Sequence, residues 1–432
     1  MNLNRRNFVR SLGLGAVATL AAPSVFAAKP RKVAPASKLP EYDAKHPADF
    51  WRAVRAQFPL LSDPVYLNTG GLGPASSPVL DMVSSVTNQL QAHSETGHPL
   101  IEPSREQMAR FLGVKAEEVC FTRNATEGNS IIAAGLTLKE GDEVIFETHA
   151  HPGGSFPWLN QAQLRGVEFK LFEPDASSPE ANLEAIRALI TPRTKVIQVS
   201  HITCTTGLVF PVKEIAALAR QHDIWFHIDG AQSVGMIPIN IDAIDCNSYA
   251  FSGHKWLGGP HETGVLYIRR SKLEGVAPTG IGAYSGELPV LTASSELAYL
   301  GAASRHEYGT RNAALICGVT EATRFQEKIG RDRIAAHGRD LATQIMAGLA
   351  NLDGIEVLTP KHDEMRGSIV TFRHARANAG DFFGYLASKH HLRCRPVSEQ
   401  GLEAIRVSPH VFTSQEDCER VIAAVHASVK DL

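Results

Sequence analysis

The chain has 432 residues, of which 44% are hydrophobic and 20% are charged, a composition typical of a soluble globular protein with two or three domains. Its 43 basic and 45 acidic residues give a formal net charge of −2, so charge offers no reason to expect binding to nucleic acid or to an acidic membrane. We therefore expect small molecules or proteins as partners.

The first residues combine a basic start with a short apolar run. Arg5 and Arg6 precede SLGLGAVATLAAPSVFAA, which ends in a small-residue site at Ala27. The run is too short and too rich in glycine and alanine for a stable membrane helix, so we predict a cleaved export signal over residues 1–27; a lipid-embedded anchor is the alternative. Residues 5–9 (RRNFV) resemble the twin-arginine signature. That resemblance implies the twin-arginine export machinery as a partner, a periplasmic location, and export of an already folded protein without a membrane anchor.

Residues 28–45 are rich in proline, lysine and alanine and predict a linker. The next segment, ADFWRAVRAQF, predicts a short amphipathic helix, and VYLNTGGLGP predicts a strand that breaks into a glycine-rich turn. Asn68 and Gly71 in this turn are candidate substrate-binding residues.

Short apolar strands then alternate with amphipathic helices. Strands are predicted at 118–122, 142–147, 167–172, 194–200 and 224–229, with helices at 126–136, 156–166, 178–190 and 211–222. This alternation predicts right-handed βαβ units, and hence an α/β domain with a mostly parallel sheet. Two more strands, at 247–253 and 263–270, predict an antiparallel hairpin at the edge of that sheet.

The pattern changes after about residue 310. A long helix from residue 312 leads to short strands at 367–373, 392–397 and 403–409, and the last helix begins at a capping box from Thr413 to Glu416. We expect residues 306–432, together with 46–69, to form a smaller α+β domain beside a large domain over 70–305.

Polar residues collect at the carboxyl ends of the predicted strands, where ligands bind in such sheets. Asp229 ends an apolar strand and needs a buried cation or a strong donor. Another strand breaks at Asn124-Ala125-Thr126, where a helix begins; its free N–H groups and the Thr126 hydroxyl predict a phosphate site, with simple helix capping as the alternative. His149 and His151 follow a third strand, before a Pro-Gly-Gly break.

Lys255 lies in the stretch SGHKWLGGP, directly after a predicted buried strand. Either it is a turn lysine in solvent, or the loop presents its amine to a ligand. Ser252 and His254 beside it are possible phosphate donors. One small molecule uses a phosphate site, a ring-stacking partner, a carboxylate for a pyridine nitrogen and a lysine for an aldehyde, and that molecule is pyridoxal phosphate.

Five segments occur in the order of a known family: Asn124–Glu127, His151, Asp229–Gln232, Ser252–Lys255 and Arg305–Thr310. Over about residues 60–430 the chain resembles the class V aminotransferases, which include isopenicillin N epimerase-like proteins, cysteine desulfurases and kynureninase. The resemblance implies fold type I architecture: a mostly parallel sheet of the seven-stranded type with helices on both faces, and a smaller α+β C-terminal domain. It also implies pyridoxal 5'-phosphate as cofactor and a homodimer.

By position, the resemblance further implies roles for single residues. Lys255 would hold the cofactor covalently, Asp229 would bind the pyridine nitrogen, His151 would stack on the ring, and Gln232 would lie near the phenolic oxygen. Lys255, Asp229 and His151 are thus the expected catalytic residues, although the sequence leaves His149 open as the stacking residue. The implied phosphate contacts are Ala125, Thr126, Ser252 and His254, with Gly309 and Thr310 reaching the phosphate of the neighbouring subunit.

Arg406 lies on a strand just before the last helix, where the family places the arginine that binds the substrate carboxylate. A guanidinium fork suits that group, and a surface ion pair is the alternative. Arg393 and Arg395 are weaker candidates, since one of two alternating residues on a strand must face away.

The reaction type stays open between several that begin at the same Cα–H bond. Cysteine desulfurases of the family carry a nucleophilic cysteine on a loop shortly before the arginine, but residues 396–405 contain none and Cys394 lies earlier. We expect an aminotransferase acting on an amino acid or a peptide-borne amino acid, as in enzymes that tailor peptide siderophores. An epimerase, a lyase or a non-catalytic cofactor-binding module are the alternatives. The six cysteines lack metal-site spacing, so no metal is expected, and their disulfide state is open.

Overall fold

The computed structural model describes residues 39–287 and 291–432. The predicted export signal with Arg5 and Arg6, and the linker up to residue 38, lie outside the described residues. Among the described helices, none combines the length and the apolar character needed to cross a membrane.

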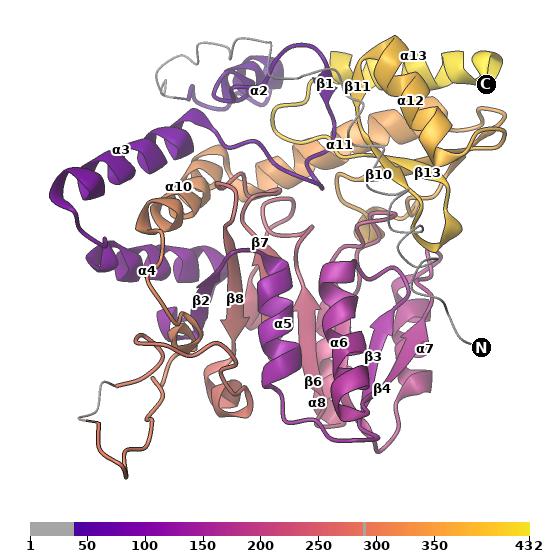
Figure 1. The fold of residues 1–432 in the computed structure, drawn as a ribbon. Coiled ribbons are helices and arrows are strands. Elements are labelled where there is room, and N and C mark those ends of the chain that lie inside the picture. Colours follow the sequence, from indigo (N-terminus) through magenta and orange to yellow (C-terminus); the bar gives the residue numbers. More distant parts are fainter. Residues whose placement is uncertain (1–38, 288–290) are drawn as a thin grey trace, which may run out of the picture. The chain divides into compact units, whose positions relative to one another are not determined.

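Seven strands form the main sheet in the order β2-β8-β7-β6-β5-β3-β4 (Figure 1). Their bounds are β2 (Val119–Thr122), β3 (Glu143–Glu147), β4 (Glu168–Phe172), β5 (Thr194–Ser200), β6 (Trp225–Asp229), β7 (Ser248–Ser252) and β8 (Gly264–Ile268). Only β8 runs antiparallel to its neighbours. The predicted α/β class with a mostly parallel sheet is confirmed.

The predicted hairpin of β7 and β8 exists and is antiparallel, but its place at the edge of the sheet was wrong. β2 pairs with the outer side of β8. Every residue of β8 is buried. A strand that is apolar along its whole length needs neighbours on both sides and on both faces, and β2 supplies the missing one.

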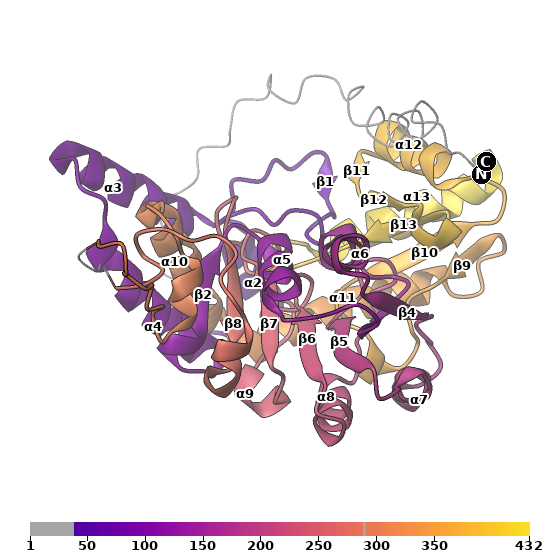
Figure 2. The same ribbon diagram turned by 60° about the horizontal axis from the view of Figure 1, so that its bottom comes forward.

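Helices cover both faces of the main sheet, and they are α5 (Ala125–Gly135), α6 (Pro152–Arg165), α7 (Pro179–Leu189) and α8 (Val212–Gln221). Figure 2 shows α5 and α6 on one face and α7 and α8 on the other. Alternate strand residues enter the two cores: Val144 and Val196 pack under α5 and α6, while Ile145 and Ile197 join the opposite core.

Three helices flank this sheet, and the third packs on the other two. They are α3 (Ser77–His93), α4 (Ile101–Leu112) and α10 (Ala313–Ile329). Ala313, Ile316 and Val319 of α10 belong to the same hydrophobic core as Phe226 of the main sheet. The short helix α9 (Ile241–Ile244) precedes β7.

The C-terminal lobe is a four-stranded antiparallel sheet covered by helices. Its strand order is β12-β13-β10-β9. The elements are β9 (Ile355–Val357), β10 (Val370–His374), β12 (Arg395–Val397), β13 (Ala404–Val407), α11 (Arg331–Leu349), α12 (Ala379–His390) and α13 (Gln415–Asp431). A separate pair joins β1 (Val65–Tyr66), which follows α2 (Pro47–Arg55), in parallel to β11 (Leu392–Arg393). An N-terminal strand therefore completes this lobe.

Two local predictions in this lobe were wrong. Residues 392–397 form two strands in different sheets, because β11 pairs with β1 while β12 pairs with β13. The capping box of α13 uses Ser414 and Asp417, one residue later than predicted: the Ser414 hydroxyl accepts from Asp417 N at 3.2 Å. The Thr413 hydroxyl is already occupied, since it accepts a hydrogen bond from His410 N at 3.0 Å.

Candidate active site

A cavity of about 280 Å³ lies at the carboxyl ends of β6 and β7. It brings together ten of the residues predicted from the sequence: Gly71, Ala125, Thr126, His151, Asp229, Gln232, Ser252, His254, Lys255 and Arg406. These residues come from the main sheet, from the glycine turn after β1 and from the C-terminal lobe. The cavity is therefore assembled by segments that are far apart in the sequence.

Lys255 extends into this cavity from the loop after β7 and is half-buried. Burial lowers the pKa of its amine, and the negative charge of Asp229 partly offsets that effect. Within the described residues, its Nζ has no hydrogen-bond or ion-pair partner. The Lys255 carbonyl oxygen accepts from Gly258 N at 3.0 Å, which closes the turn behind the side chain. The loop thus presents a free amine to the cavity.

Asp229 stands at the end of β6 and is 5% exposed. Its Oδ2 accepts from Asn129 Nδ2 at 2.8 Å, and its Oδ1 accepts from Ala231 N at 3.0 Å. A β-carbon at Gly154 would lie 2.9 Å from Oδ2, so α6 comes this near only because that residue is glycine. The carboxylate is therefore fixed by two donors while it lines the cavity.

The hydroxyl groups of Thr126 and Ser252 line the cavity where α5 begins. The side chain of Asn124 accepts from Glu127 N at 2.9 Å, and Ala125 N donates to Ser252 Oγ at 3.1 Å. Thr126 is exposed, and a β-carbon at Gly153 would stand 2.3 Å from its Oγ1. A helix N-terminus with hydroxyl groups beside it is suited to an anion such as phosphate.

His254 borders the same wall. Its Nδ1 donates to the Thr263 carbonyl oxygen at 3.2 Å, which leaves Nε2 available. Burial, together with the neighbouring charge of Lys255, lowers the pKa of His254 to about 4.

The structure separates the two histidines that follow β3. His151 lines the cavity, its Nδ1 accepts from Gly153 N at 3.0 Å, and burial and Lys255 lower its pKa. His149 is directed elsewhere: its Nδ1 lies 2.8 Å from Thr205 Oγ1 and its Nε2 lies 3.1 Å from Glu173 Oε1. Of the two, His151 is the residue that can contact a ligand next to Lys255.

Gln232 ties the glycine turn to the cavity. Its Nε2 donates to the Gly70 carbonyl oxygen at 2.9 Å, and its Oε1 accepts from Trp256 Nε1 at 2.7 Å. A β-carbon at Gly70 would lie 2.9 Å from that Oε1. One amide N–H of Gln232 thus remains for a ligand.

Arg406 of β13 faces Arg395 of β12 as its cross-strand partner, and both line the cavity. Arg406 is 2% exposed; it donates to the Cys204 carbonyl oxygen at 2.7 Å and to Asn68 Oδ1 at 3.0 Å. It forms no ion pair within the described residues, whereas Arg395 pairs with Glu399.

Burial and the charge of Arg395 lower the pKa of Arg406 to about 10. Like charges directly opposite each other destabilise a sheet, so this wall is built to receive an anion.

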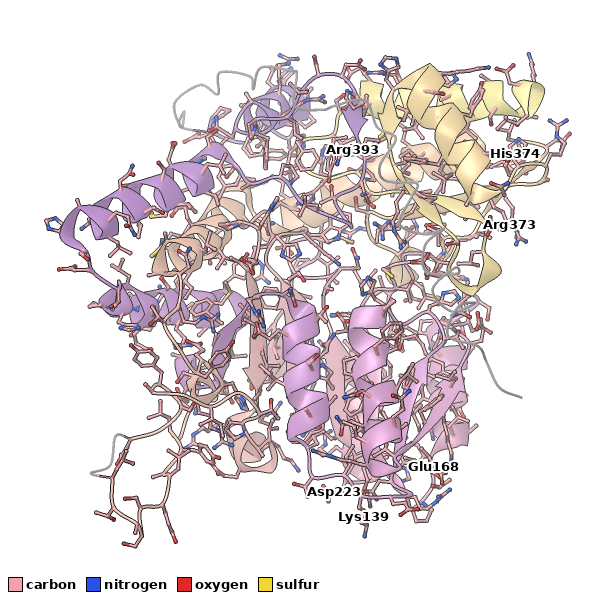
Figure 3. All side chains as sticks on the ribbon, in the orientation of Figure 1. Lys139, Glu168, Asp223, Arg373, His374 and Arg393 are labelled. Carbon is pink, nitrogen blue, oxygen red and sulfur yellow. The ribbon has the colours of Figure 1, made fainter. Side chains whose placement is uncertain are left out.

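The remaining predicted residues lie outside the cavity. Asn68 stands behind Arg406 and orients it through the hydrogen bond just described. Gly309 and Thr310 line a different cavity of about 210 Å³. Arg393 is exposed, with its guanidinium 5.4 Å from the ring centre of Tyr66. In Figure 3 it lies at the β1–β11 pair.

Sequence reasoning did not single out the lining residues Gly70, Ala231 and Cys204. Cys204 lies in the loop after β5. Nothing in its local pattern signalled this, because the loop reaches the cavity only through its contact with Arg406. Burial raises the pKa of its thiol. Cys394 is buried in the C-terminal lobe with a thiol pKa raised to about 12. All six cysteines are free thiols, and the described residues contain no cluster suited to a metal ion.

The chain is similar to known proteins over most of its length. The model of the family described as Aminotransferase class-V matches residues 77–421. The probable cysteine desulfurase of Vibrio cholerae serotype O1 is 30% identical over 400 residues, which cover 87% of this chain and 98% of that protein. Isopenicillin N epimerase of Amycolatopsis lactamdurans is 28% identical and covers 88% and 98%. The apo structure of a cysteine desulfurase from Thermococcus onnurineus NA1 superimposes with a TM-score of 0.80 at 26% identity, covering 88% of this chain and 98% of that one.

Proposed function

Because the chain belongs to the aminotransferase class-V family, we propose that it acts as an aminotransferase on the Cα amino group of an amino acid, free or carried on a peptide. The observation that carries this proposal is a single cavity shared by the Lys255 amine, the Asp229 carboxylate and the Arg406 guanidinium. These are the groups needed to bind an amino acid and to move a proton at its Cα.

Pyridoxal phosphate is the cofactor of the chain, and the residues present fit it. The Lys255 amine has no other partner in the described residues. The start of α5 offers donors to a phosphate, and the space beside Thr126 exists because residue 153 is glycine. When bound, the cofactor supplies an electron sink for the bonds at the substrate Cα.

The residues of the chain then have distinct tasks. Lys255 would hold the cofactor covalently, and its Nζ would take and return the Cα proton of the substrate. Its lowered pKa raises the share of uncharged amine above that of an exposed lysine. Asp229 would hold the pyridine nitrogen in its protonated form, and His151 would pack on the ring.

Arg406 is the proposed partner of the substrate carboxylate, because its buried guanidinium forms no ion pair among the described residues. Arg395 adds a second guanidinium to the same wall. Its Nη1 is buried and makes no hydrogen bond within the described part of the chain. Two such groups favour a substrate with two anionic groups, such as an amino acid with an acidic side chain.

An epimerase or a lyase is the second candidate, and two of the relatives favour it: isopenicillin N epimerase and the probable cysteine desulfurase. Desulfurase chemistry needs a reactive thiol. The loop at residues 396–405 has none, and the one thiol at the cavity, Cys204, is held protonated by burial. This favours transamination over persulfide formation.

The test is to mix the cofactor-loaded protein with a panel of amino acids and N-terminal peptides, with and without a keto-acid acceptor. Transamination converts the cofactor to its amine form and yields a keto acid. Racemised substrate without keto acid would establish an epimerase, and sulfide or another eliminated group would establish a lyase. No spectral change with any amino acid would indicate a non-catalytic binding module.

We also propose a homodimer and a periplasmic location, with tailoring of a peptide siderophore as one setting. Support for the location comes from the residues around Arg5 and Arg6. Changing both to lysine should leave a cofactor-loaded, uncleaved protein in the cytoplasm. Normal periplasmic accumulation of that variant would contradict export by the twin-arginine machinery.

A further inference from the structure

Asp229 is the end point of a chain of side-chain hydrogen bonds along one face of β6. Because alternate strand residues share a face, Trp225, His227 and Asp229 point the same way, and Ser248 of β7 and Asn129 of α5 fill the gaps between them. The distances are 2.8 Å from Trp225 Nε1 to Ser248 Oγ, 2.8 Å from Ser248 Oγ to His227 Nδ1, 2.9 Å from His227 Nε2 to Asn129 Oδ1, and 2.8 Å from Asn129 Nδ2 to Asp229 Oδ2.

The partners fix the direction of every bond in this chain. Asn129 Nδ2 contacts the Gly153 carbonyl oxygen at 3.1 Å as well as the Asp229 carboxylate, and both groups only accept. Asn129 Oδ1 therefore faces His227, whose Nε2 must carry the hydrogen. Burial lowers the pKa of His227 to about 4, so the ring is neutral and its Nδ1 accepts from the Ser248 hydroxyl. That hydroxyl oxygen in turn accepts from Trp225 Nε1–H.

Every donor in the chain thus points toward Asp229. Hydrogen bonds aligned in this way polarise one another, and donors aimed at a carboxylate favour its charged form. Ser248 and His227 are 0% exposed and Asn129 is 1% exposed, so water does not compete for these bonds.

We propose that His227 and Asn129 are positioning residues that hold the Asp229 carboxylate turned toward the cavity with a hydrogen-bond donor aimed at it, so that Asp229 keeps the pyridine nitrogen of the cofactor in its protonated form. The proposal rests on the role given to Asp229 in the proposed function. It adds that this role depends on two residues that do not line the cavity.

A purely structural role is the competing explanation, because buried polar groups need partners wherever they lie. Gln198 of β5 provides a matched comparison. It pairs in register with His227 and is 1% exposed. It accepts from Trp158 Nε1 at 2.7 Å and donates to the Gly154 carbonyl oxygen at 3.1 Å, but it makes no hydrogen bond to Asp229. A Gln198→Met variant loses comparable buried bonds without touching the proposed chain.

The experiment reads the ring nitrogen itself. The holoenzyme is reconstituted with cofactor labelled with ¹⁵N in the pyridine ring, and the ¹⁵N chemical shift is followed against pH. His227→Phe and Asn129→Leu should each lower the pH midpoint of ring protonation by about one unit or more, a tenfold change in proton affinity. Gln198→Met should keep the wild-type midpoint. His227→Gln should also keep the wild-type midpoint, because the Nε2 of the glutamine side chain can still donate to Asn129 Oδ1.

The outcomes distinguish the role of Asp229 from the role of the hydrogen-bond chain behind it. If Asp229→Ala leaves the ring nitrogen protonated, the role of Asp229 in the proposed function fails. If Asp229→Ala lowers the midpoint but His227→Phe and Asn129→Leu do not, only the proposed chain fails. The other titratable groups near Asp229 are unchanged in every variant, and they are Glu147, His151, Tyr249 and Lys255.

A measurement on the unmodified protein covers the case in which His227→Phe does not fold. In ¹⁵N-histidine-labelled wild type, with the His227 signal assigned through its loss in His227→Gln, the ring should carry its hydrogen on Nε2. A hydrogen on Nδ1 would overturn the proposal.

Discussion

Gly73 packs directly against the backbone of Lys255. A β-carbon at residue 73 would stand 1.7 Å from the Lys255 carbonyl oxygen, and Gly73 N donates to the His254 carbonyl oxygen at 2.7 Å. Only glycine permits so close an approach. The glycine turn after β1 thus braces the loop that carries the amine, and this bracing explains how a loop can hold a lysine side chain in a cavity.

Borohydride reduction of the loaded protein should fix the cofactor on the peptide that contains Lys255. The reason is that its amine has a lowered pKa and no partner in the described residues. Peptide mass spectrometry is the measurement, and Lys255→Ala should show no trapped cofactor. Label on Lys272, which lies 3.7 Å from the Asp223 carboxylate, would contradict the assignment.

Asp229→Ala should retain cofactor but slow Cα–H exchange by at least about 100-fold, because a charge aimed at the reacting system is lost. Exchange is measured by proton NMR of a substrate in deuterated water, at saturating cofactor. Asp245→Ala, on a partly exposed carboxylate in surface ion pairs, is the matched control and should exchange normally. Wild-type exchange in Asp229→Ala would exclude the proposed role.

Arg406→Met should raise KM for amino acids with a free carboxylate by about 10- to 100-fold, because it removes a hydrogen bond to a charged group. Arg395→Met should raise KM by a similar factor for substrates with a second anionic group, and it should leave KM unchanged for substrates with neutral side chains. Steady-state kinetics on matched pairs such as glutamate and glutamine separate the two effects. Arg393→Met serves as control, since its exposed side chain packs on Tyr66 instead of lining the cavity.

Thr310→Ala should weaken cofactor binding and the dimer together. Thr310 lines a cavity other than that of Lys255, and in the proposed homodimer it would reach the phosphate bound by the second subunit. A ligand held by both subunits stabilises their association. Sedimentation with and without cofactor measures both effects. A monomer with full cofactor affinity would end the shared-site idea, and Thr292→Ala, on an exposed threonine, should behave as wild type.

Acid should destabilise the fold between about pH 6.5 and pH 4. Burial lowers the pKa of His201, His227, His306 and His410 to about 4. Below pH 6.5 the unfolded chain therefore binds more protons than the folded one, and the free energy of unfolding falls as pH falls. Each such histidine lowers the free energy of unfolding by about 2 kcal/mol when the pH falls from 7 to 5. Urea unfolding at both pH values measures the loss.

Single variants test the origin of that loss. His306→Gln should reduce the pH dependence by one histidine's share, whereas His46→Gln should not, because His46 is exposed. An equal unfolding free energy at pH 7 and pH 5 would contradict the whole account.

Much of the fold follows from local sequence patterns. The strands from β2 to β8 are apolar runs bounded by helices with one polar face, so the sequence predicts each of them within about two residues. The pairing of β2 with β8 could not be predicted from local sequence patterns. Pairing between residues 119–122 and 264–268 is a long-range choice that the local pattern of neither strand encodes.

The residues of the candidate site also divide into those that the local sequence predicts and those that it does not. Asp229 and Lys255 were predictable because a charged residue at the end of a buried apolar strand needs a specific reason. The choice of His151 over His149, and of Arg395 over Arg393, depends on which way a side chain turns after its strand ends. Asn129 gave no signal, since an asparagine inside a helix acquires its role only from its contact with Asp229.

The pairing of β1 with β11 has a mechanical consequence for the cavity. Asn68 also forms a bridge with Ser408, and Arg406 Nη2 holds Asn68 Oδ1 at 3.0 Å. Arg406 and Asn68 are therefore fastened to each other, although more than three hundred positions separate them in the chain. The same glycine turn is hydrogen-bonded to the main sheet side of the cavity, through Gly70 to Gln232 and through Gly73 to the His254 carbonyl oxygen. A change that loosens the pairing of β1 with β11 should therefore disturb the arginine and the Lys255 loop together.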